Sequence, residues 1–140
     1  MLSPKRTKYR KPHRSTLKTT ILCNNFLSFG EYGLQSIQYT WITSRQIEAS
    51  RRVLTRYTRR RGKIWIRVFP DKIITKRSPE TRIGSGKGRP NYNVTEVFHG
   101  TIIFELRGVS SNIARQAIKI AASKLPIKAK FIEKSYLKFL

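Results

Sequence analysis

The side chains with the clearest chemistry in this sequence are arginines, and they are concentrated in one segment. Seven arginines lie between Arg45 and Arg61, where Glu48 is the one acid. A guanidinium group binds phosphate through paired hydrogen bonds, whereas like charges spaced this closely on a free helix repel one another. Such a run is often only a solvated helix face, but the near-absence of acids favours a phosphate-bearing partner.

A second cluster of bases opens the chain. Residues 1–22 contain two prolines and few large aliphatic side chains, so the segment cannot bury enough apolar surface to fold by itself. We expect a basic N-terminal arm that becomes ordered on RNA or DNA. Its candidate phosphate ligands are Lys5, Arg6, Lys8, Arg10, Lys11 and Arg14.

Residues 77–90 combine glycines with bases, and we expect a long mobile loop there. A nucleotide-binding loop needs four residues between its first glycine and Gly-Lys, then Ser or Thr, and Gly88 stands at that last place. We therefore interpret the segment as a glycine loop whose backbone approaches RNA closely. A surface loop without a role is the alternative. The candidate residues are Arg82, Gly84, Gly86, Lys87, Gly88 and Arg89.

The sequence contains few candidate residues for enzymatic chemistry. The seven acids are scattered, and two histidines and the lone Cys23 make no recognisable metal site or nucleophilic dyad. The sequence therefore predicts no catalytic residue, no metal, no cofactor and no small-molecule substrate. A deaminase or nuclease would need a metal cluster that this pattern lacks.

The composition of the whole chain supports a nucleic-acid partner. Thirty lysines and arginines against seven acids give a net charge of +23 in 140 residues, and such a chain gains free energy by releasing counterions from a polyanion. No window is apolar enough to span a bilayer and no secretory signal opens the chain, so we expect no membrane partner. With 39% hydrophobic residues, a single domain over 23–140 should pack a core.

The local patterns predict an α+β fold with a mostly antiparallel sheet and two helices. A capping box from Thr43 to Gln46 predicts a helix over 44–60, with Ile47, Ser50 and Leu54 on its core face. Gly62 is expected to end it, and Ser110 to cap a second helix over 111–125. We expect strands within 26–42 and over 63–69, 73–75 and 128–134, and a hairpin of 93–98 with 101–107.

Four segments resemble those of a known family over nearly the whole length of the chain. They are MLSPKRTKYRK at 1–11, RQIEA at 45–49 followed by two arginines, GKIWIRVFPDK at 62–72 and KLPIK at 124–128. These strings are similar to the bacterial and organellar large-subunit ribosomal protein numbered sixteen. Residues 42–57 and 82–88 look most like plastid members.

The resemblance implies a structural constituent of the large ribosomal subunit with a hammerhead-like sheet. Its partners would be large-subunit ribosomal RNA, tRNA and neighbouring ribosomal proteins. The loop would lie near the peptidyl transferase region and aminoacyl-site tRNA, with Arg82 at the position of an arginine that some bacteria hydroxylate. The remaining candidate ribosomal RNA ligands are Arg45, Arg51, Arg52, Arg56, Arg59, Arg60, Lys63 and Arg67.

No transit peptide precedes the family's usual start, so the resemblance implies a protein made inside the plastid. A bacterial or mitochondrial location is the alternative. The sequence also leaves open a free nucleic-acid chaperone or DNA-binding module, which would bind isolated duplexes.

Overall fold

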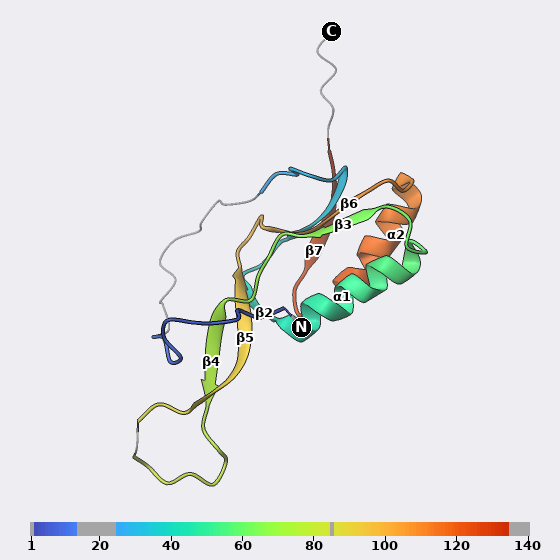
Figure 1. Ribbon diagram of the computed structural model, residues 1–140. Helices are drawn as coiled ribbons and strands as arrows, with labels where there is room; N and C mark the ends of the chain where they lie inside the picture. Colours follow the sequence, from blue (N-terminus) through green and yellow to red (C-terminus); the bar gives the residue numbers. More distant parts are fainter. Residues whose placement is uncertain (1, 14–24, 85, 135–140) are drawn as a thin grey trace.

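The computed structural model describes residues 2–13, 25–84 and 86–134, and it has two antiparallel sheets with two helices (Figure 1). The four-stranded sheet has the order β3 (Lys63–Ile66), β6 (Ile102–Arg107), β1 (Tyr32–Ser36), β7 (Ala129–Glu133). The three-stranded sheet has the order β2 (Thr40–Thr43), β5 (Arg89–Val97), β4 (Lys72–Lys76). This confirms the expected α+β class.

Helices α1 (Ser44–Tyr57) and α2 (Ser111–Ala122) pack on each other and on one face of the four-stranded sheet. The core between them includes Leu34, Leu54, Phe104 and Ile118. The Ser50 hydroxyl donates to the Ala121 carbonyl at 3.2 Å and links the two helices. The burial of Leu54 alone is worth about 2 kcal/mol, so the apolar stripe of α1 fixes which face of the helix remains outside.

The opposite face of this sheet is covered by the chain that leads into β1. Gly33 lies on that face, where an added Cβ would meet Leu27 at 2.5 Å. The Glu105 carboxylate on the central strand β6 accepts hydrogen bonds from the backbone N–H groups of Phe29 and Gly30 at 2.7 and 2.6 Å. Residues 27–30 therefore form a covering layer that requires glycine at 33 and an acceptor at 105.

The predicted hairpin of 93–98 with 101–107 is wrong. β5 pairs with β2 and β4, whereas β6 pairs with β1 and β3 in the other sheet. Gly100, with φ of +84°, instead carries the chain from one sheet to the other. Alternating apolar residues show that each segment is a strand, but they do not encode which neighbour it pairs with. The hairpin that exists is β4–β5, closed by residues 77–88.

The helix ends also differ from the prediction. The capping box at Thr43 is confirmed, but α1 ends at Tyr57 with Thr58 as C-cap, before Gly62. α2 begins after Ser110 as predicted, without a capping hydrogen bond from that side chain, and ends at Ala122. Ile113 on this helix is 43% exposed, because the α1–α2 contact buries Ala114, Ala117 and Ala121 and leaves the side of α2 that carries Ile113 open to solvent.

Several strand ends shift by a few residues. β3 ends at Ile66 and not at 69. Beyond this end, the Arg67 N–H still donates one backbone hydrogen bond to the Ile103 carbonyl. β4 covers all of Lys72–Lys76, and β7 runs over Ala129–Glu133. β5 begins at Arg89, so the last two residues of the expected loop belong to a strand.

Candidate nucleic-acid interface

The outer face of α1 presents arginines to solvent, as the helical periodicity predicts. Arg45, Arg52 and Arg56 are exposed on the helix, while Ile47, Ser50 and Leu54 are buried on the other side. The capping box fixes where the helix begins, and the buried stripe fixes its rotation. The same three-to-four-residue spacing that forms the core therefore places the guanidinium groups together on one surface.

The one acid of this helix pairs with its neighbours. Glu48 accepts hydrogen bonds from Arg51 at 2.8 Å and from Arg52 at 2.9 Å. These bonds, first that from Arg51, lower the pKa of Glu48 to about 2, and the bond to Glu48 raises the pKa of Arg51. Glu48 therefore stays ionised and orients two guanidinium groups, yet it offsets only one positive charge.

The arginine surface continues beyond the end of the helix. Arg59 and Arg60 have left-handed φ values of 50° and 61°, a conformation that is costly for residues other than glycine. The Arg60 N–H donates to the Thr55 carbonyl at 2.9 Å and stabilises the turn. Both side chains are exposed, so the strained turn adds two cations to the end of the α1 surface.

A groove of about 1000 Å³ opens beside this turn, between the outer shoulders of α1 and α2. Arg56 and Arg59 line it together with Arg61 and Lys124. Neither Arg61 nor Lys124 was among the expected ligands. Arg61 belongs to the same arginine run and could have been included, whereas no sequence signal brings Lys124 to this place.

Lys63 and Arg67 on the following strand have different surroundings. Lys63 is exposed, with its ammonium 5.2 Å from the centre of the Trp65 ring. The Arg67 side chain is only 12% exposed and forms an ion pair with the fully buried Glu105. Of these two expected phosphate ligands, Lys63 is accessible, while Arg67 is bound inside the protein.

The N-terminal arm is described over residues 2–13. Its five bases in that range, Lys5 through Lys11, are exposed, and Arg14 lies outside the described residues. The arm passes beside the three-stranded sheet (Figure 1). Pro4 and Thr7 of the arm line a hollow there with Ile73 of β4. Leu2 packs against the core. The bases expected as phosphate ligands in this range are therefore accessible, and the composition gave no sign of the apolar anchor at Leu2.

The glycine loop projects away from both sheets at the end of the β4–β5 hairpin (Figure 1). Arg82 is exposed, and Gly84 and Gly86 have positive φ with no atom within 4 Å of an added Cβ. At the base, an added Cβ on Gly88 would lie 2.6 Å from the Lys76 carbonyl oxygen. Gly88 is thus needed to close the hairpin, while the other two shape an open tip.

The arm and the loop touch each other. The Lys11 ammonium donates to the Lys87 carbonyl at 3.1 Å, and the Lys87 ammonium donates to the Pro12 carbonyl. Two segments far apart in sequence therefore form one basic surface around the three-stranded sheet. The arginine face of α1 forms the other basic surface.

Other kinds of site are not found in the part of the chain that the structure describes. There, no three His, Cys, Asp or Glu side chains come together to hold a metal ion. Neither of the two described helices combines the length and the apolar character that crossing a bilayer requires.

Comparison with known proteins agrees with this picture. Residues 4–132 match the model of the ribosomal protein L16p/L10e family. The chain belongs to that family. It is 59% identical over 133 residues to the large ribosomal subunit protein uL16c of Tetradesmus obliquus, which covers 95% of this chain and 96% of the relative. This family member is of the plastid type and is not an enzyme.

Two further relatives are almost as similar. The large ribosomal subunit protein uL16c of Brachypodium distachyon is 58% identical over 132 residues, with 94% of this chain and 97% of the relative covered. That of Bigelowiella natans is 58% identical over 134 residues, with 96% and 98% covered. Each relative matches the chain over nearly its full length, so the resemblance to the plastid members is confirmed.

Proposed function

We propose that this chain, a structural component of the large subunit of the plastid ribosome, binds large-subunit ribosomal RNA and helps to position tRNA in the aminoacyl site. The uncompensated arginine surface of α1 carries the proposal. Arg52, Arg56 and the Arg59–Arg60 turn are exposed, and Glu48 offsets a single charge. A surface of this kind is stabilised by phosphates that replace its counterions.

The arm and the α1 surface would hold the chain on ribosomal RNA from two sides. The arm is anchored at Leu2 and exposes the bases from Lys5 to Lys11. Because the arginines of α1 lie on a rigid helix, we assign them to backbone phosphates of folded RNA. Arg14 is kept as an expected ligand, and Arg67 is assigned to the ion pair with Glu105 instead of to RNA.

The glycine loop is the part we assign to tRNA. Its tip extends beyond the sheets, and Arg82 and Ile83 are exposed there. The loop contributes few bases compared with α1 and the arm, so it adds little to retention on the ribosome. An open tip that glycine allows to approach a phosphate backbone fits a contact that is made only while tRNA is bound.

Sedimentation of plastid extract tests the proposed function directly. A tagged copy of the chain should travel with large subunits and stay with them through a moderate salt wash. A free nucleic-acid chaperone or DNA-binding module would instead remain near the top of the gradient and bind isolated duplex tightly. That second distribution would contradict the ribosomal assignment.

A further inference from the structure

A row of aromatic and basic side chains lies on the sheet face opposite the two helices. Trp65 on β3 is the register partner of Glu105 on β6, so both side chains point to the face that residues 27–30 cover. Phe29 from that covering segment stacks with Trp65, with ring centres 6.1 Å apart and planes 20° apart. The Lys63 ammonium lies over the Trp65 ring, and the Arg67 guanidinium is 5.0 Å from the Phe29 ring centre.

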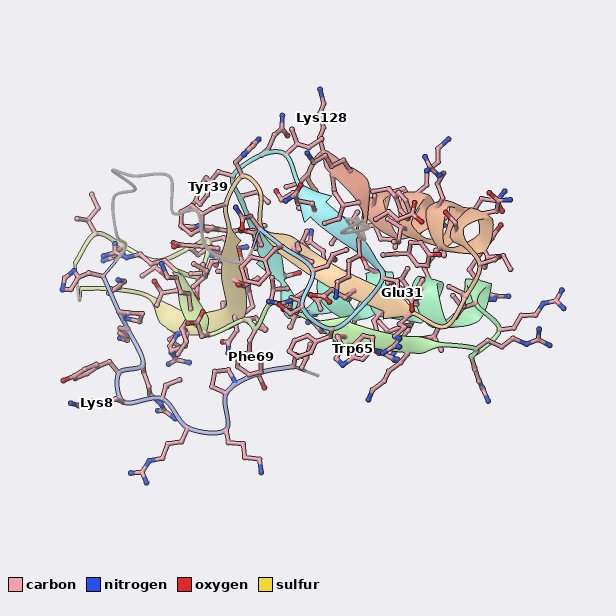
Figure 2. The ribbon with its side chains drawn as sticks, turned by 90° about the horizontal axis from the view of Figure 1, so that it is seen from above. Lys8, Glu31, Tyr39, Trp65, Phe69 and Lys128 are labelled. Carbon is pink, nitrogen blue, oxygen red and sulfur yellow. The ribbon has the colours of Figure 1, made fainter. Side chains whose placement is uncertain are left out.

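This row is accessible, unlike the core aromatics. Phe29 is 54% exposed, and Trp65 is half-buried. Phe69, farther along the same side, is 48% exposed (Figure 2). Core packing does not explain why a protein of net charge +23 leaves a cluster of aromatic rings exposed, because burying these rings would stabilise the fold.

The charges around the row select the kind of partner. Lys63 and its register partner Arg107 are exposed cations on this face. Two acids lie nearby, and both are already paired: the buried Glu105 with Arg67, and Glu31 with Arg107 at 3.2 Å. Rings flanked by cations suit a ligand that combines flat apolar surface with negative charge, which describes a nucleotide better than an apolar protein segment.

We propose that the Phe29–Trp65 row binds an unpaired nucleotide of large-subunit RNA, with the base stacked on Trp65 in the place that the Lys63 ammonium holds in the free chain. Base stacking on an aromatic ring is stronger than an exposed cation–π contact. The displaced Lys63 ammonium then pairs with the phosphate of the same nucleotide. Paired bases in a duplex do not offer their faces, so the site selects single strands.

The inference rests on the proposed ribosomal function, but it concerns a surface on the far side of the domain from the helices. The arginines of α1 would bind phosphates of folded RNA, and the aromatic row would hold an unpaired base. The chain would then join two RNA elements, one on each face of the four-stranded sheet.

Tryptophan fluorescence of the full chain tests the site. In a Trp41→Phe background, Trp65 is the only tryptophan. Short single-stranded oligoadenylate should quench its emission by about twofold or more, and the matched oligoadenylate–oligouridylate duplex should quench it little. Phe29→Leu in the same background should weaken single-strand binding roughly five- to tenfold and leave duplex binding unchanged.

The outcomes separate this site from the proposed function. Unchanged Trp65 emission while fluorescence anisotropy shows the labelled single strand bound would overturn the inference, as would an equal loss of duplex binding in Phe29→Leu. Replacing Arg52, Arg56 and Arg59 by Gln should weaken RNA binding and leave Trp65 quenching intact at saturation. In ultraviolet-irradiated large subunits, the Trp65 peptide should cross-link to RNA, and a cross-link to protein instead would contradict the proposal.

Discussion

Glu105 shows how one buried acid organises a strongly basic chain. Burial raises the pKa of its carboxyl, but the backbone N–H groups of Gly30, Phe29 and Ser28 and the Arg67 side chain lower it more, so the net shift is downward. The carboxylate joins the covering segment to the central strand and holds Arg67 beneath the Phe29 ring. A single ionised group thus fixes three elements.

Replacing Glu105 by Gln should lower the free energy of unfolding by about 2–4 kcal/mol, because an amide cannot accept all of these donors and leaves Arg67 without its counter-charge. Urea unfolding at neutral pH, followed by circular dichroism, measures the effect. Glu133→Gln removes an exposed acid and is the matched control, with an expected change within about 0.5 kcal/mol. Equal losses in both variants would refute the role given to Glu105.

Stability should also fall in acid for the same reason. The folded-state pKa of Glu105 lies below its unfolded value of about 4.3. Its contribution is therefore complete above that unfolded value and is lost as the pH falls through the folded-state pKa. Urea midpoints measured from pH 6 down to about 3 should drop less steeply in Glu105→Gln than in the unchanged chain. Parallel curves would contradict the linkage.

The helices and strands were predictable where the signal is local. The capping box at Thr43 and the stripe of Ile47 and Leu54 were enough to predict the start and rotation of α1. The β5–β6 hairpin was wrong because strand pairing depends on contacts distant in sequence. α1 ends at Tyr57 because a turn with left-handed φ at Arg59 and Arg60 follows it. Such a turn is unfavourable for arginine, so a prediction based on Gly62 placed the helix end too late.

The arm contributes more to the fold than its composition suggests. Deleting residues 1–23 should preserve the helical circular dichroism signal and cost about 1–2 kcal/mol of stability, because the packing of Leu2 against the core is lost. The shortened chain should also enter large subunits poorly, because its bases are gone. Leu2→Ala in the full chain is the control: it should reproduce the loss of stability and assemble normally. Loss of the helical signal on deletion would show that the domain needs the arm to fold.

The glycine loop should affect translation more than assembly. Replacing Arg82 and Lys87 by Ala should leave subunit association close to normal and weaken tRNA binding in the aminoacyl site or slow peptide-bond formation. The exposed lysines Lys119 and Lys130, both changed to Ala, are a control with equal loss of charge. Filter binding of tRNA to purified ribosomes measures the effect.

One pattern would make the loop an assembly element instead. The double variant would fail to enter subunits, yet the few subunits that contained it would bind tRNA normally. The contact of Lys87 with Pro12 of the arm makes this comparison necessary, because the arm is expected to take part in assembly.

In the whole protein, the basic surfaces lie apart from the hydrophobic core. Helix α1, which carries the arginine surface, belongs to the helical layer, whereas the loop projects from the far end of the three-stranded sheet (Figure 1). The net charge of +23 predicted a polyanionic partner correctly in kind, and the arginine run predicted the exposed arginine face of α1. The joining of arm and loop, and the aromatic row behind the sheet, depend on tertiary contacts that no sequence pattern encodes.

The salt dependence of binding to large-subunit ribosomal RNA tests the central claim most directly. When Arg52, Arg56 and Arg59 are changed to Gln, the plot of log affinity against log salt should become shallower by about 0.7–0.9 for each phosphate that the chain no longer neutralises. Changing Lys119, Lys128 and Lys130 to Gln removes the same charge from exposed positions away from the α1 surface and should alter the slope much less. A slope that is unchanged in the arginine variant, or that falls equally in both variants, would contradict the account.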